Sequence, residues 1–141
     1  MKKILIISDS TIGRHFIQRA IDTFTKDNIY YVIQPKAAVF ENAPASRFKF
    51  FEFDPTSLYK LSNVLKMEFS QVFIAMKNPT DIENTISNIR ISKKQLRIIV
   101  IDHWGLHLED TNIVQINTNE ILASHMFDYL PNVPVIAQNV G

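Results

Sequence analysis

Ser8–Gly13 is the segment of this chain whose residues are best suited to binding a phosphate group. It follows a short apolar run and precedes a helical pattern, which is the position of the G-x-G-x-x-G dinucleotide motif in nucleotide-binding folds. Only the third glycine of that motif, Gly13, is present, because serines stand at the first two positions. Ser10 places a side chain where a pyrophosphate normally approaches the backbone, and Asp9 adds a negative charge. Two interpretations stay open: Ser10 or Thr11 donates to an anion at the helix N-terminus, or the loop keeps its shape without nucleotide affinity.

Three further polar residues follow predicted strands. Gln34 stands where dinucleotide-binding proteins carry an acid for the ribose hydroxyl groups. Asp54 offers a carboxylate to a ligand or a divalent ion, but a hard cation needs several oxygen ligands, so the alternative is a cap on the following helix. Lys77 would repel a cation and pair with a phosphate, or else stay solvated.

The densest polar cluster is the segment Asp102–Asp110. Its two imidazoles, on His103 and His107, are four residues apart, the spacing that puts two zinc ligands on one helix face. Gly105 lies between them and the segment has no apolar helical stripe, so we expect no metal site. His15 is the one group near the predicted phosphate end that titrates around neutral pH. No serine stands in a G-x-S-x-G motif and cysteine is absent, so no catalytic residues are predicted.

The composition is that of one soluble globular domain. The chain has 141 residues, of which 46% are hydrophobic and 21% are charged, and its formal net charge is only +1. These values exclude a disordered chain and argue against a nucleic-acid-binding protein, which usually has a clear basic excess. The longest strongly apolar stretch, Val72–Met76, is far shorter than the ~20 residues of a membrane span. We therefore expect a soluble domain that binds no nucleic acid and does not insert into the membrane. The absence of cysteine fits a cytoplasmic protein.

Short apolar runs predict the strands. Ile4–Ile7, Val72–Ala75 and Ile98–Ile101 lack the apolar and polar alternation of a half-exposed strand, so both of their faces should be buried, as in a parallel sheet. Further strands are expected at Tyr30–Ile33, Phe48–Phe53 and Ile113–Ile116. Gln34–Ser46 is the long irregular segment.

Apolar residues that repeat at steps of three and four predict four helices, at Ile12–Phe24, Leu58–Leu65, Ile82–Ile89 and Thr118–Leu130. Asp54-Pro55 and Asn78-Pro79 each predict an N-cap followed by proline at the first helical position, and Asn117 with Glu120 resembles a capping box. Strands that alternate with helices predict an α/β fold. We expect a doubly wound, mostly parallel, Rossmann-like sheet of about six strands with helices on both faces.

Six short motifs stand in an order that is typical of one family. They are Lys3-Ile4-Leu5-Ile6-Ile7 followed by Gly13; Phe53-Asp54-Pro55-Thr56-Ser57-Leu58, like G-D-x-T-x-x-x-L; Phe69-Ser70-Gln71-Val72-Phe73-Ile74-Ala75, like A-D-x-V-I-A; Asn84-Thr85-Ile86; Leu96-Arg97-Ile98-Ile99-Val100; and Ile113-Val114-Gln115-Ile116-Asn117-Thr118, like A-D-x-V-I-S-P. By these motifs the chain resembles, from Lys3 to about Leu130, the N-terminal Rossmann-type subdomain of the RCK/KTN family, the TrkA-N-like regulators of potassium channels and transporters.

The resemblance implies a cytoplasmic, ligand-sensing regulatory module that forms a homodimer and reports to a potassium channel or transporter subunit in the membrane. Residues 1–141 would form a single domain of this type within a longer protein. Members of the family bind NAD(H) or adenine nucleotides in the cleft at the carboxyl ends of the strands. Carried over by position, the cofactor-binding residues are Ser8, Ser10, Thr11, Ile12, Gly13, Gln34, Asp54, Ala75, Met76 and Lys77.

The departures from the family pattern bear on the ligand. Because two glycines and the ribose acid are replaced, we expect NAD(H) to bind weakly or not at all, and an adenosine mono- or diphosphate to be the better ligand. Some relatives also hold divalent ions with acids after the third and fourth strands, but Lys77 stands in place of the second acid.

Two other functions use a similar fold. An NAD(P)-dependent oxidoreductase-like domain would need an acid/base pair near the cleft and a substrate domain, and neither is apparent in the sequence. A phosphoacceptor receiver-like domain would use Asp9 and Asp54. It would also need a second acid beside Asp9, a hydroxyl residue after the fourth strand and a lysine after the fifth, where the chain has serines, Ala75 or Met76, and Asp102. We favour the regulatory module, which is not an enzyme.

The C-terminal part of the chain indicates association. Helix Thr118–Leu130 carries apolar residues on more of its surface than one core-facing stripe requires, and residues 133–140 add further apolar side chains. Such a surface usually marks an interface, here between two copies; the alternative is that the tail folds back on its own domain.

Overall fold

Six parallel strands form one sheet in the computed structural model, which describes residues 1–23, 27–103 and 110–131. The strand order is β3-β2-β1-β4-β5-β6, the order of a doubly wound sheet whose two halves meet between β1 and β4. All of the predicted strands are present: β1 (Lys2–Ser8), β2 (Asn28–Gln34), β3 (Phe48–Glu52), β4 (Gln71–Ala75), β5 (Arg97–Ile101) and β6 (Ile113–Ile116). The expected α/β fold is therefore confirmed.

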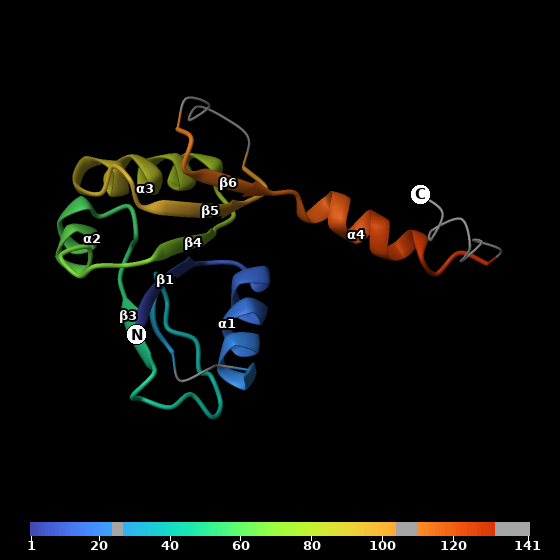
Figure 1. The fold of residues 1–141 in the computed structure, drawn as a ribbon, viewed down its shortest axis with the longest axis horizontal. Helices are drawn as coiled ribbons and strands as arrows, with labels where there is room; N and C mark the ends of the chain where they lie inside the picture. Colours follow the sequence, from blue (N-terminus) through green and yellow to red (C-terminus); the bar gives the residue numbers. More distant parts are fainter. Residues whose placement is uncertain (24–26, 104–109, 132–141) are drawn as a thin grey trace.

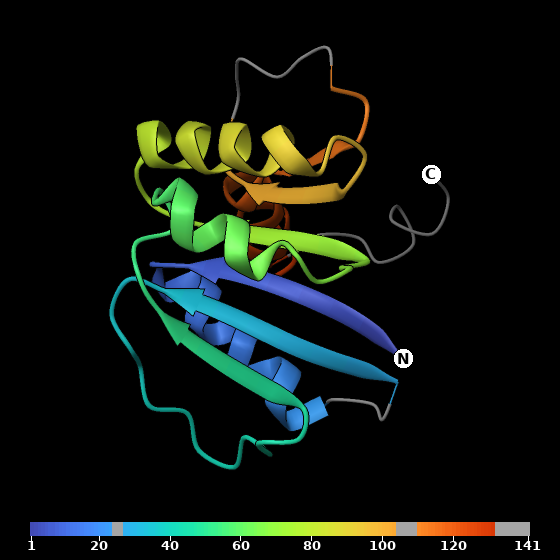
Figure 2. The same ribbon diagram turned by 90° about the vertical axis from the view of Figure 1, so that its left-hand side faces the viewer.

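Helices cover both faces of the sheet (Figures 1 and 2). α1 (Thr11–Thr23) lies on one face, and α2 (Leu58–Val64) and α3 (Pro79–Ser92) lie side by side on the other. The side chains of β1 alternate between the two layers, because Leu5 and Ile7 belong to the core under α2 and α3 while Ile4 and Ile6 belong to the core under α1. Both faces of this central strand are buried, as its continuous apolar run predicts.

Asparagine side chains cap two of the helices, as predicted. The side-chain oxygen of Asn78 accepts from the amides of Thr80 and Asp81 at the start of α3. That of Asn117 accepts from the amide of Glu120 at the start of α4 (Thr118–Phe127). Each cap satisfies amides that have no partner within the helix, and so fixes where the helix begins.

The cap predicted at Asp54 is wrong. α2 begins at Leu58, and its N-cap is Ser57. Asp54 accepts instead from the amide and the hydroxyl of Thr56, over 2.9 and 2.8 Å, and closes a tight turn that ends before the helix. Pro55 therefore lies in this turn and not at the first helical position.

α4 extends away from the sheet and buries none of its residues (Figure 1). It ends at Phe127, three residues before the predicted end. Near its base, on the α1 side of the sheet, lie three apolar side chains of β5 and β6 that no described helix covers. We call them the open face: Ile101, Val114 and Ile116, which alternate along β5 and β6 with residues that face α2 and α3. No helix in the described ranges has both the length and the apolar content that crossing a membrane requires.

Candidate functional site

The carboxyl ends of β1 and β4 form the crevice where a doubly wound sheet binds its ligand. The chain leaves β1 for α1 on one face and leaves β4 for α3 on the other, so the two exits diverge. Ser8 and Ala75 are partners in the register of the two strands. The loop Ser8–Gly13 therefore lies at the crevice, as the sequence predicts.

Ser10 joins this loop to β4. Its hydroxyl donates to the carbonyl oxygen of Ala75 over 2.8 Å and accepts from the amide of Gly13 over 3.2 Å. The hydroxyl hydrogen that the sequence offers to an anion is thus engaged by the protein. The first two amides of α1, those of Thr11 and Ile12, make no hydrogen bond within the described residues. These amides are the donors that an anion would meet at the start of the helix.

Asp9 spans the crevice. Its amide donates to the carbonyl oxygen of Ala75 over 3.3 Å, and its Oδ1 accepts from the amide of Lys77 over 2.9 Å. Both bonds connect the loop after β1 to the residues that follow β4. A carboxylate is consequently held between the two strand ends.

Two small pockets flank this connection, each of about 240 Å³. The first, which we call the β2-side pocket, is lined by residues of the first loop and of the segment after β2: Ser8, Asp9, Ser10, Thr11, Arg14, Gln34, Pro35, Lys36 and Ala38. The second, the β5-side pocket, is lined by Ser10, Ile12, Ala75, Met76, Lys77, Ile101 and Asp102. Except for Gly13 and Asp54, every predicted cofactor-binding residue lines one of the two.

Gln34 is the distinctive residue of the β2-side pocket. Its residue surface is only 7% exposed, and its side-chain amide makes no hydrogen bond to any described residue. An amide offers two donor hydrogens and an acceptor oxygen, and leaving such a group buried without a partner costs about 1–3 kcal/mol. Gln34 lines the pocket, and the hydrogen-bonding capacity of its amide is therefore available to a ligand there.

Two cations of the same pocket were not predicted from the sequence. Arg14 lies in the first turn of α1, one residue after Gly13, and Lys36 follows β2 two residues after Gln34. Their positive charges are opposite in sign to the charge of Asp9, which lines the same pocket. A search for basic residues in the first helical turn and just after the second strand would have found both.

In the β5-side pocket, Asp102 connects the crevice to α4. Its backbone is in the left-handed region, with a φ of 52°. Its carboxylate accepts from the amide of Thr118 over 2.7 Å and from the hydroxyl of the same residue. The wall of the pocket is thereby bonded to the first residue of the projecting helix.

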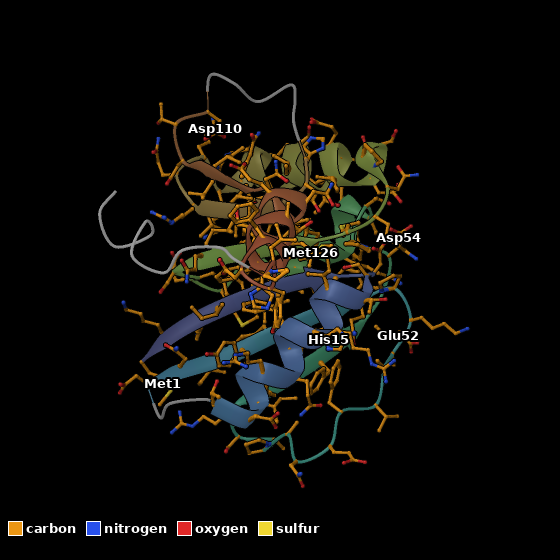
Figure 3. All side chains as sticks on the ribbon, turned by 90° about the vertical axis from the view of Figure 1, so that its right-hand side faces the viewer. Met1, His15, Glu52, Asp54, Asp110 and Met126 are labelled. Carbon is orange, nitrogen blue, oxygen red and sulfur yellow. The ribbon has the colours of Figure 1, made fainter. Side chains whose placement is uncertain are left out.

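Asp54 is not brought to the crevice. It follows β3, the edge strand, and lines neither of the two pockets (Figure 3). The amide of Thr56, and after it the hydroxyl, donate to the carboxylate and hold the pKa of Asp54 below its usual value of 3.8. This carboxylate belongs to a turn before α2.

The histidines do not form a site in the described part of the chain. The ring of His103 is buried and pairs with the carboxylate of Glu83 on α3. His107 and Gly105, the other residues of the predicted cluster, lie outside the described residues. His15 is exposed on α1 and lines neither pocket (Figure 3). The described ranges contain no group of three side chains able to hold a metal ion.

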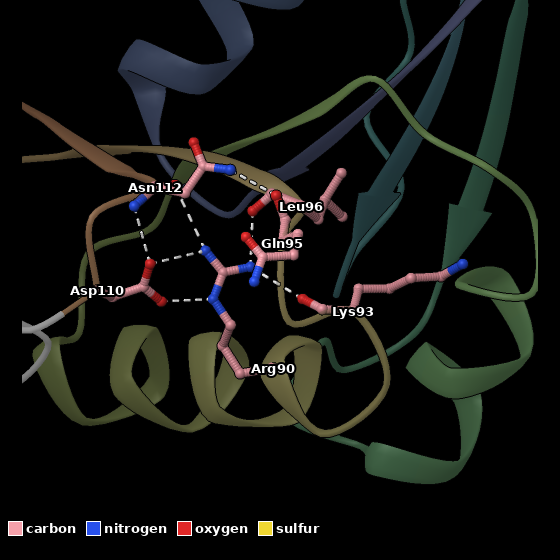
Figure 4. Close-up of polar contacts among 6 residues, drawn as sticks. All are labelled: Arg90, Lys93, Gln95, Leu96, Asp110 and Asn112. Atoms are coloured by element: carbon pink, nitrogen blue, oxygen red, sulfur yellow. Dashed lines mark hydrogen bonds and ion pairs between the residues drawn. The ribbon is translucent and has the colours of Figure 1, made fainter.

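Another hollow, of about 740 Å³, lies at the other end of the strands. Beside it Arg90 donates to Asp110 over 2.5 Å and to the carbonyl oxygens of Lys93 and Leu96 over 2.9 and 2.6 Å (Figure 4). Arg90 thus joins the end of α3 to the segment that precedes β6. We assign this cluster a structural role.

Comparisons with known proteins give the fold. The sequence matches no family model and no curated protein. The structure is similar to the AMP-bound C-terminal domain (CTD) of Kef from Shewanella denitrificans, with a TM-score of 0.69 and 13% identity, over 99% of this chain and 87% of that one. It is also similar to the human SLO3 gating ring, with a TM-score of 0.55 and 14% identity, over 82% of this chain and 24% of that one. At these identities the likeness concerns the fold alone, and it agrees with the doubly wound α/β fold expected from the sequence.

Proposed function

We propose that this chain is a ligand-sensing regulatory module, not an enzyme, and that it binds an adenine nucleotide weakly in the β2-side pocket. The observation that carries the proposal is the buried side chain of Gln34, whose amide has no partner within the described chain. A ribose presents adjacent hydroxyl groups, which are both donors and acceptors and so suit an amide. The AMP bound to the Kef domain, which shares this fold, supports the same class of ligand.

The surroundings of Gln34 suit the phosphate of such a ligand. Thr11 lines the pocket, and its amide and that of Ile12 next to it have no partner among the described residues. Both amides are at the start of α1, where the helix dipole favours an anion. Arg14 and Lys36 line the same pocket and add two positive charges. Among the described residues of the pocket no nucleophile is hydrogen-bonded to a base, so the arrangement is suited to binding and offers no catalytic pair.

Isothermal titration of the protein with AMP tests the proposal. We expect Gln34→Leu to weaken binding about tenfold without lowering the melting temperature, because leucine buries an apolar group where an unpaired amide stood. Arg14→Gln should weaken binding by a similar factor. Arg19→Gln, on the same helix but outside the pocket, is the matched control. Unaltered AMP affinity in Gln34→Leu and Arg14→Gln, or no AMP binding by the unmodified protein, contradicts the proposal.

We further propose that the module is a cytoplasmic homodimer within a longer protein and that it regulates a potassium channel or transporter. The apolar side chains of α4 stand in solvent in a single chain, and the open face lies at the base of the same helix. Ser10 lines both pockets, and Asp102 bonds the wall of the β5-side pocket to the start of α4. This gives a ligand in the β2-side pocket a route to the interface. The proposed regulation of a potassium channel or transporter is tested by measuring potassium flux in cells that carry the natural gene with Arg14→Gln. A flux that matches the unmodified gene would contradict it.

A further inference from the structure

The connection between the two pockets is the feature of the crevice that the sequence motif does not explain. A dinucleotide binds across the two halves of a doubly wound sheet. Its pyrophosphate lies between them, against the loop after the first strand. In this chain Ser10 lines both pockets, so that crossing point lies at Ser10 and its neighbours. The side chains of two loop residues, Asp9 and Ser10, lie at this crossing point.

Both of these side chains are fixed. Ser10 donates to the carbonyl oxygen of Ala75, and Asp9 accepts from the amide of Lys77. The amide of Asp9 adds a third bond, to the carbonyl oxygen of Ala75. The loop is therefore held across the crevice by contacts with the end of β4, and a pyrophosphate could take this position only by breaking them.

The negative charge of Asp9 at the crossing point also disfavours a pyrophosphate. The carboxylate of Asp9 lines the β2-side pocket, where Arg14 and Lys36 provide the opposite charge. A single phosphate at the amides of Thr11 and Ile12 can lie beside these cations. A second phosphate that continues toward the β5-side pocket approaches Asp9, and two like charges at short range repel strongly in a partly buried site.

We propose that Asp9 is the specificity-determining residue of this crevice and restricts it to ligands with one phosphate group. The inference rests on the proposed function, because it concerns the same pocket. It assigns Asp9 two effects: its bond to Lys77 closes the path between the pockets, and its charge disfavours a second phosphate. AMP is accordingly preferred to ADP and to NADH.

Binding of AMP, ADP and NADH by the unmodified protein and two variants tests this. Asp9→Asn keeps an oxygen for the amide of Lys77 and removes the charge, whereas Asp9→Gly removes both. We expect the unmodified protein to prefer AMP over ADP and NADH by about tenfold or more. Asp9→Asn, which loses only the charge, should lose part of this preference, and Asp9→Gly, which loses the charge and the bond, should lose most of it. Asp22→Asn, which makes the same charge change on α1 outside the pockets, should keep it. The melting temperature of each variant reports whether it is folded.

The outcomes separate the two proposals. If the unmodified protein binds AMP but the preference is the same in folded Asp9→Asn and Asp9→Gly, the role of Asp9 is wrong and the proposed function stands. If the unmodified protein binds no nucleotide, the proposed function is wrong. In that case NADH binding gained by Asp9→Gly supports the role of Asp9, and its continued absence overturns that role as well.

Discussion

Ser8 and Gly13 pack against each other where α1 passes over the end of β1. A Cβ atom at position 13 would lie 1.9 Å from Ser8 Oγ and 3.0 Å from the Cβ of Ala75. Real Cβ atoms do not approach other atoms so closely, so any larger residue must move α1 or displace the buried Ser8. The hydrogen bonds of Ser10 to Gly13 and Ala75 join the same two elements, the start of α1 and the end of β4.

We therefore expect Gly13→Val to lower the free energy of unfolding by about 1–3 kcal/mol, the usual cost of overpacking a filled site. Urea denaturation measures this change. Arg19→Val, on the exposed side of the same helix, is the control and should cost only the lower helix propensity of valine, less than about 1 kcal/mol. Equal stability of Gly13→Val and the unmodified protein would remove the close-packing role of Gly13.

A second prediction concerns the titration of Asp54. Because donation by Thr56 holds the folded-state pKa of Asp54 below 3.8, the ionised carboxylate stabilises the fold above that pH. This contribution is lost as the pH falls through the folded-state pKa. The effect on stability is small because the group is largely exposed to solvent. The carboxyl carbon resonance of Asp54 in an NMR titration should have its midpoint below 3.8.

Thr56→Val provides the matched variant for this titration. It removes the hydroxyl donor but keeps the backbone amide, which is the larger cause of the shift. The midpoint should rise toward 3.8 and remain below it. A midpoint at 3.8 or above in the unmodified protein would show that the turn does not form in solution.

A third prediction compares two ion pairs that differ in burial. Arg90 and Asp110 have side chains only 14% and 19% exposed, whereas Glu68, the partner of Lys93, is 90% exposed. Arg90→Met should lower the free energy of unfolding by about 2 kcal/mol, because it also removes donors from the carbonyl oxygens of Lys93 and Leu96. Lys93→Met should cost less than about 0.5 kcal/mol. If chemical denaturation finds equal losses for the two variants, Arg90 does not join α3 to the segment before β6.

The sheet could be predicted from the sequence because burial on both faces gives continuous apolar runs. Ile4–Ile7 and Ile98–Ile101 have this pattern, and both lie inside parallel strands. Ile101 departs from the expected burial, because it belongs to the open face and is only partly buried. The position of the loop Ser8–Gly13 follows from the same pattern, since the loop of the first crossover always lies at the carboxyl end of its strand.

The details of the site could not be predicted in the same way, because they depend on contacts between distant segments. Asp54 was expected near the ligand from its place after a strand, but β3 is at the sheet edge and the chain order of strands does not give their spatial order. The bond between Asp9 and Lys77 joins residues 68 positions apart. Likewise, the sequence predicts that a serine in a phosphate-binding position donates to the ligand. Only the fold shows that the Ser10 hydroxyl donates to the carbonyl oxygen of Ala75 instead.

The last prediction concerns the association of two chains through α4. Leu122 and Met126 lie one turn apart on α4, about 40° from each other around the helix axis, and Tyr129 follows the end of the helix. All three are more than half exposed, with Met126 at 63% (Figure 3). A solvated apolar surface of this kind is favourably buried against another, and the open face, which includes Val114 at 37% exposure, offers one on a second copy.

Light scattering at tens of micromolar should therefore give the mass of a dimer for the unmodified protein and of a monomer for Met126→Glu. Ser124→Glu adds the same charge to α4 about 200° around the axis from Leu122, and it should leave the dimer intact. Because neither residue is buried within its own chain, both variants should keep the cooperative melting transition of a folded domain. A monomeric unmodified protein, or a Met126→Glu variant that still dimerises, would place the contact between copies elsewhere or remove it.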